Sequence, residues 1–123
     1  MWAAAVKICA RSLNGAEADR VDLDFANANK TENDSAYAEI LLCLGDEDAA
    51  AAHFIARLDD PERRAAALRA VQKTLEADYD LPIGAELDRR QAAVAARADV
   101  AAAIEKVGRI IDLPFFPIYW GDY

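Results

Sequence analysis

Alanine supplies 29 of the 123 residues, and this limits the chain to a small range of folds. Alanine is the best helix former, and its small side chain lets helices approach each other closely. Larger apolar residues recur between the alanines at helical spacing, as in Tyr37, Ile40, Leu41 and Leu44. We therefore expect an all-α domain of antiparallel helical hairpins over residues 1–112.

Residues that end or cap helices divide the chain into about six or seven helices. Gly15 ends the first helix, Gly45 and Asp46 separate two others, and Pro61 opens a further one. The expected helices run over about residues 1–13, 17–29, 36–44, 47–58, 61–75, 85–97 and 100–111.

The apolar spacing also predicts which helix faces are buried. In the first helix the expected buried stripe is Trp2, Val6, Cys9 and Leu13. The second segment is ambiguous, because Val21, Leu23 and Phe25 alternate with aspartates as in a strand, while Val21, Phe25 and Ala28 form a helical stripe. We favour a helix there, since no partner strand is near and an isolated strand could not satisfy its backbone groups.

The charge of the chain excludes some classes of partner. The formal net charge is −8 and the pI is about 4.5. Nucleic-acid binding normally needs a basic surface, and so does attraction to anionic lipids. We expect no nucleic-acid partner and no membrane, and we expect neutral, cationic or basic partners instead.

The two cysteines, Cys9 and Cys43, lie among apolar neighbours and form no CxxC motif or Cys/His cluster. Buried reduced thiols are the favoured interpretation, and a disulfide between the two is the alternative. The opening residues lack the basic start of a signal peptide, and no stretch approaches the roughly 20 apolar residues of a membrane-spanning helix. A cytoplasmic protein is therefore expected.

Residues with catalytic or metal-binding potential are few and scattered. His53 is the one histidine, and it has no companion cysteine or carboxylate at metal-ligand spacing. The serines look like helix-end residues, the glycines form no phosphate-binding loop, and most carboxylate pairs coincide with helix starts. We expect no catalytic, cofactor-binding or metal-binding residues and no enzyme. The arginines at positions 57, 63, 64 and 69 either add positive charge to a concave face or, the favoured view, lie on a solvated helix face.

The final segment, residues 113–123, is aromatic. Its aromatic residues are Phe115, Phe116, Tyr119, Trp120 and Tyr123. Such a segment is costly to leave in water, because each aromatic side chain can bury roughly 150–250 Å². The favoured prediction is that it packs back on the last helices as a cap. The alternatives are docking on a partner through those five residues, and a homodimer formed through the tail.

One predicted pair of helices has a distinctive residue pattern, in which a Gly-Asp turn is followed by a small residue and then by an aromatic one. The residues in this pattern are Gly45, Asp46, Ala50, Phe54 and Leu58. With these spacings the segment over residues 37–61 resembles one unit of the tetratricopeptide repeat. The pattern departs from the family in its first helix and at Arg57, where a small residue is usual, and no second copy follows at a period of about 34 residues. The resemblance implies a helical array, and any such array would present a concave face; a helical bundle without repeats is the alternative.

These observations predict a non-enzymatic protein–protein interaction module. A partner peptide or helix would bind in a groove between helical hairpins, with aromatic anchors supplying most of the binding energy. The alternative function is a small acidic inhibitor or mimic that occupies a basic site on a target protein. The two differ in their response to salt, because only the inhibitor should lose affinity steeply as ionic strength rises.

Overall fold

The computed structural model describes residues 1–75 and 82–114, and this part of the chain is all-α, as the sequence predicts. The seven helices in the described part are α1 (Trp2–Leu13), α2 (Arg20–Ala28), α3 (Asp34–Leu44), α4 (Glu47–Asp59), α5 (Arg64–Ala70), α6 (Pro82–Ala95) and α7 (Ala98–Val107). Within the same residues, no helix combines the length and the hydropathy needed to cross a bilayer.

Capping side chains fix the starts of three helices. Asp19, Asn33 and Asp46 each accept a hydrogen bond from a backbone N–H two or three residues further on, at the starts of α2, α3 and α4. Gly45 ends α3 in the left-handed conformation, with φ of 70°. The ambiguous segment after Asp19 is therefore a helix.

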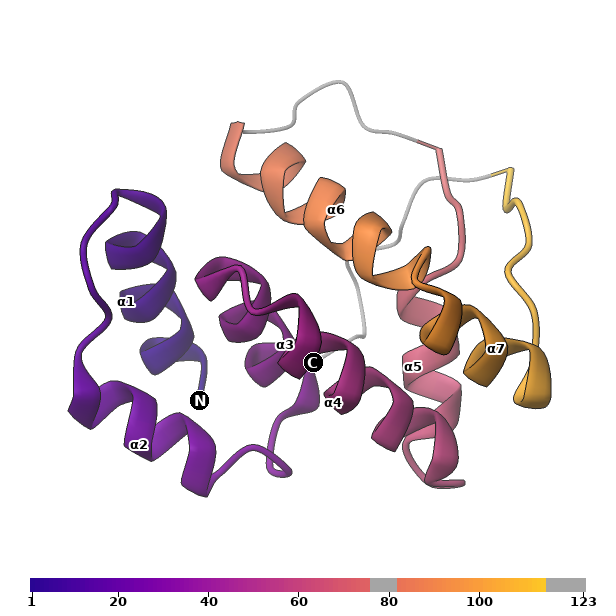
Figure 1. Ribbon diagram of the computed structural model, residues 1–123, viewed down its shortest axis with the longest axis horizontal. Coiled ribbons are helices and arrows are strands. Elements are labelled where there is room, and N and C mark those ends of the chain that lie inside the picture. Colours follow the sequence, from indigo (N-terminus) through magenta and orange to yellow (C-terminus); the bar gives the residue numbers. More distant parts are fainter. Residues whose placement is uncertain (76–81, 115–123) are drawn as a thin grey trace.

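The first three helices share one small core. Its buried residues are Ala5, Ile8, Ala26, Ala36 and Ile40. Figure 1 shows α1 and α2 together at one end of the molecule, with α3 between them and the remaining helices. Because alanine fills so much of this core, the helices approach closely and the two isoleucines supply the interlocking side chains.

A second core joins α3 to the last four helices. Leu58 of α4 and Val100 and Ile104 of α7 are among its buried residues, with Ala67 of α5 and Val94 of α6. In Figure 1, α6 lies above α3 and α4, and α7 continues from its end toward the right side of the view. The two cores thus meet at α3, and α1 and α2 reach the rest of the molecule mainly through that helix.

A disulfide bond between Cys9 and Cys43 reinforces the contact between α1 and α3. The expectation of reduced thiols was wrong. Both cysteines are buried, as predicted, but the sequence does not show that α1 and α3 pack with the two Cα atoms 5.0 Å apart, which is within the range for a disulfide.

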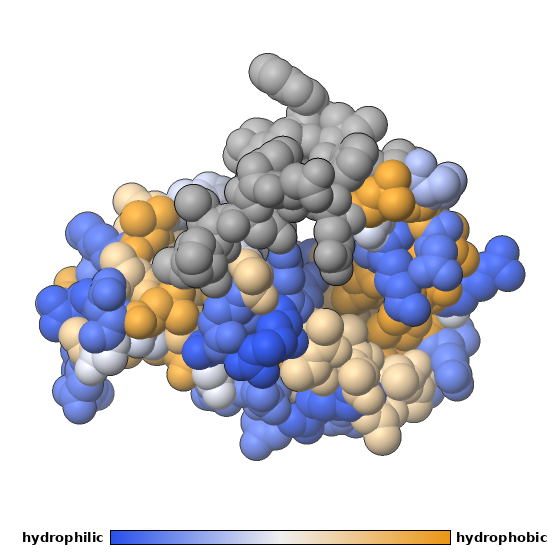
Figure 2. Space-filling model, turned by 90° about the horizontal axis from the view of Figure 1, so that it is seen from above, coloured by the Kyte–Doolittle hydropathy of each residue, from blue (hydrophilic) through white to orange (hydrophobic). Residues whose placement is uncertain are grey.

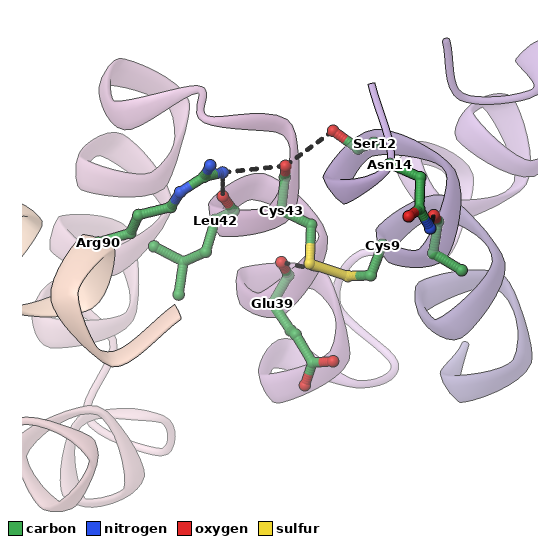
Figure 3. The surroundings of a disulfide bond; sticks show 8 residues. Cys9, Ser12, Asn14, Glu39, Leu42, Cys43 and Arg90 are labelled. Carbon is green, nitrogen blue, oxygen red and sulfur yellow. Dashed lines mark hydrogen bonds between the residues drawn. A yellow bond between two sulfur atoms is a disulfide. The ribbon is translucent and has the colours of Figure 1, made fainter. Parts of the chain in front are cut away.

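The C-terminal end of α3 is held by side chains from two other helices. Arg90 of α6 donates hydrogen bonds from Nη1 to the carbonyl oxygens of Leu42 and Cys43, at 2.6 and 3.0 Å. Ser12 of α1 donates to the carbonyl of Cys43 at 2.8 Å. Figure 3 shows both side chains converging on this helix end, where unpaired carbonyls carry partial negative charge. A cation there is favourable and ties α6 to α3.

Two helices are shorter than the apolar spacing predicts. The expected helix over residues 61–75 is helical only over α5, and the last helix ends at Val107 instead of continuing to residue 111. The segments that follow α5 and α7 run side by side, with backbone hydrogen bonds joining Lys73 to Ile111 and Leu113. Gly108 permits this approach, since a Cβ on it would lie 2.8 Å from a methyl carbon of Leu68.

The buried faces of α1 and α2 also differ from the prediction. Val6 and Val21 are 62% and 76% exposed, and Trp2 and Phe25 are also exposed. The buried residues of α1 include two alanines, Ala4 and Ala5, and in α2 the buried residue is Ala26. In Figure 2, hydrophobic side chains accordingly reach the surface in separate patches among hydrophilic ones.

Candidate functional site

A groove of about 320 Å³ lies between α3, α4 and α6. Its apolar lining residues include Leu42 of α3, Phe54 of α4, and Leu87 and Val94 of α6, with Val71 from the segment after α5. Its polar lining residues are Ser35, Glu39, His53, Arg57, Asp88 and Gln91. The volume lies at the lower end of the range of ligand pockets, and the mainly apolar lining with a few polar groups is typical of them.

Four side chains form a partly buried polar cluster, and two of them, His53 and Arg57, line this groove. His53 and Arg57 are one helical turn apart on α4 and therefore share a face. Asp34 stands in the first turn of α3, where a negative charge is favoured, and Arg63 lies just before α5. Packing of α3 on α4 brings these four residues together.

Asp34 is the centre of this polar cluster. Arg63 forms a bidentate pair with it, through Nε at 2.8 Å from Oδ2 and through Nη2 on Oδ1. The Nε of Arg57 lies 3.8 Å from Oδ2, and the Nε2 of His53 lies 3.5 Å from Oδ1. One carboxylate thus faces two guanidinium groups and an imidazole.

The surroundings shift the pKa values of the polar cluster. Burial alone would raise the pKa of Asp34, but the hydrogen bond from Arg63 and the charges of Arg63 and Arg57 lower it. Burial lowers the pKa of His53 below its ordinary 6.5, and the positive charges of Arg57 and Arg63 add to this against the opposing effect of Asp34. Burial also lowers the pKa of Arg57. His53 is therefore neutral near neutral pH. Arg63 is balanced by Asp60 as well as by Asp34, since its Nη1 lies 3.9 Å from the Oδ2 of Asp60.

The expectation of a solvated helix face was wrong for Arg57, whose side chain is only 5% exposed. His53 is packed, with its side chain 9% exposed and its ring edge-on to Tyr37 at 5.0 Å between centroids. Sequence spacing within one helix indicates Arg57 as a neighbour of His53, but Asp34 comes from another helix. In the sequence, Asp34 is only the residue after the Asn33 cap at the start of a helix. Nothing nearby in the sequence links it to His53, so its place beside that histidine could not be predicted.

Binding is the chemistry that this arrangement supports best, with apolar contacts along the walls and positive charge at the base. No group of three or more metal-ligand side chains occurs among residues 1–75 and 82–114. Glu39 also lines the groove, and its burial raises the pKa of its carboxyl.

The five tail aromatics that the sequence predicts as partner-binding residues lie outside the described residues. Their role, as cap or docking element, stays a prediction, and so does the homodimer. The same holds for the likeness to the tetratricopeptide repeat. Comparisons of the chain with protein-family models, with characterised proteins and with solved structures found no significant match.

Proposed function

We propose that this protein is a non-enzymatic protein–protein interaction module, and that a peptide or helix of a partner binds in the groove between α3, α4 and α6. The observation that carries the proposal is the groove itself, which combines apolar walls with a polar base. Peptide recognition commonly uses a groove between helices with a few apolar anchor positions.

The positions of the apolar side chains support the proposal. Leu87 lines the groove from α6 and is only half-buried, so it has contact area left to offer a ligand. Leu42 and Phe54 are half-buried as well and pack on the second core, which gives the opposite wall a rigid backing. A preformed site loses little conformational entropy on binding.

The acidic-inhibitor function remains the second candidate, because the chain carries a net charge of −8. Several basic side chains are already paired with acids, including Arg89 with Glu86 and Arg97 with Asp48. A mimic would present the surplus carboxylates to a basic target, and raising the salt concentration would weaken that complex steeply. The affinity of a partner bound in the groove by apolar contacts would change little with the salt concentration.

The disulfide bears on where the module would act. Disulfides persist in oxidising compartments and are rare in the cytosol. The cytoplasmic location predicted from the sequence therefore requires that Cys9 and Cys43 be reduced there. Alkylation of free thiols in intact cells, followed by mass measurement, shows whether the two cysteines are reduced, as expected in the cytoplasm, or disulfide-bonded, as expected in an oxidising compartment.

Peptide-display selection on the intact protein tests the proposal. Selected peptides are then titrated against a Leu87→Glu variant, which places a charge in the groove wall, and against Val21→Glu, a control on the exposed face of α2. We expect binding at least about tenfold weaker for Leu87→Glu and unchanged for Val21→Glu. Equal affinity for all three proteins would refute the groove as the binding site.

A further inference from the structure

The base of the groove holds a buried cation whose hydrogen bonding is incomplete. The Arg57 side chain is 5% exposed and lines the groove. Its Nε is buried and has no hydrogen-bond partner among the described residues, and the same is true of the Nε2 of His53. Buried polar atoms are normally paired, because leaving one unpaired costs about 1–3 kcal/mol, and more for a charged group.

The carboxylate in the polar cluster does not remove this deficit. Arg63 already occupies both oxygens of Asp34 with a bidentate pair. Arg57 stands at 3.8 Å from the same carboxylate, beyond hydrogen-bonding distance. Arg63 is balanced by Asp60 as well, whose Oδ2 lies 3.9 Å from its Nη1, so Arg57 is the guanidinium of the polar cluster that has no hydrogen-bonded carboxylate of its own in the described part of the chain, and it lines the groove.

Other charges at the groove restrict which anion could bind there. Glu39 and Asp88 also line it, so a ligand with several negative charges would be repelled. A single carboxylate carried by an otherwise apolar segment meets less of this repulsion, places its apolar part against Leu42 and Leu87, and matches the planar fork of an arginine.

We propose that Arg57 and His53 form a carboxylate subsite at the base of the groove, and that the subsite takes the side-chain carboxylate of an aspartate or glutamate in an apolar partner segment. This inference rests on the proposed function, since it names the chemistry of the partner that the groove receives. An Arg–carboxylate pair shielded from water is stronger than one on the surface, so the subsite would contribute to partner selection as well as affinity.

Binding of a small probe pair to the isotope-labelled full chain tests the subsite. Hydrocinnamate carries a phenyl ring and one carboxylate, and hydrocinnamamide is its neutral counterpart. Both are titrated by NMR against the native protein, against Arg57→Met, and against Arg89→Met as a matched control on the exposed side of α6. The signals followed are the groove amides and the side-chain Nε–Hε of Arg57.

We expect the native protein and Arg89→Met to bind the acid about tenfold more tightly than the amide, and Arg57→Met to bind both equally. Equal binding of acid and amide to the native protein would overturn the subsite and leave the groove proposal standing. A preference for the acid that survives in Arg57→Met would also overturn it. If neither probe perturbs the groove amides, both proposals fail. The native comparison and the Arg57 Nε–Hε shift need no variant, so the test holds even if Arg57→Met does not fold.

Discussion

Asp34 is the residue on which the polar cluster depends, because its carboxylate lies against both Arg57 and Arg63. Asp34→Asn would leave the buried Arg57 without a counter-charge, and we expect it to lower the free energy of unfolding by about 3 kcal/mol. Arg57→Met removes the buried charge itself and keeps the Asp34–Arg63 pair, so its effect should stay within about 1 kcal/mol. Urea unfolding of the two variants measures the difference, and equal losses would contradict this account.

The lowered pKa of His53 predicts that the free energy of unfolding depends on pH. Burial lowers its pKa in the folded protein, so below its ordinary 6.5 the unfolded chain binds a proton that the folded chain does not. The contribution of His53 is fully present above 6.5 and is lost as the pH falls through its lowered folded pKa.

Unfolding of the native protein and of His53→Gln between about pH 7 and pH 5 measures this contribution. The stability of the native protein relative to the variant should fall as the pH is lowered. The raised pKa of Glu39 acts in both proteins and cancels in the difference, and Asp34 acts only below its ordinary 3.8. A flat difference would refute the buried neutral imidazole.

At the scale of the helices, two glycines should respond in opposite directions. Gly45 ends α3 with φ of 70°, so Gly45→Ala should lower the free energy of unfolding by about 1 kcal/mol. Gly84 lies in the first turn of α6, and a Cβ there would meet nothing within 4 Å. Gly84→Ala should therefore raise the stability by about 0.5–1 kcal/mol. Thermal unfolding of both variants checks the pair, and a loss in both would count against the assigned helix end.

The disulfide should stabilise the contact of α1 with α3. It joins residues 34 apart in the sequence, and for a loop of that length the chain-entropy estimate is about 4 kcal/mol. Reduction of the native protein should lower the urea midpoint to that of a Cys9→Ala, Cys43→Ala double variant, on which the reductant itself has no effect. If two thiols titrate before reduction as well as after it, the bond is absent and this prediction fails.

The helices themselves could be predicted from the sequence because their signals are local. The Asp46 cap and the Gly45 stop act within a few residues, and α3 and α4 lie where those residues indicate. Buried faces were harder to predict, because in α1 the side chains that pack are alanines, while Val6 points to solvent. Assigning the larger apolar residues to the packed face was therefore wrong for α1, because closely packed helices place small residues there.

At the scale of the whole molecule, the all-α class follows from composition and periodicity, but the groove does not. It forms where α6 returns over α3 and α4, held there by Arg90 on the end of α3. Likewise, Asp34 meets Arg57 and Arg63 only after the helices pack. Contacts of this kind join residues far apart in the sequence, so the spacing of residues within one helix does not predict them.

Binding of partners in the groove between α3, α4 and α6 can be located residue by residue in solution. Amide chemical-shift mapping of the intact protein with its tightest selected peptide tests it most directly. We predict that the largest shifts fall on groove residues such as Leu42, Phe54 and Leu87, and that they persist when the salt concentration is raised. Shifts centred on the exposed acidic surface and abolished by salt would contradict the claim and favour the acidic inhibitor instead.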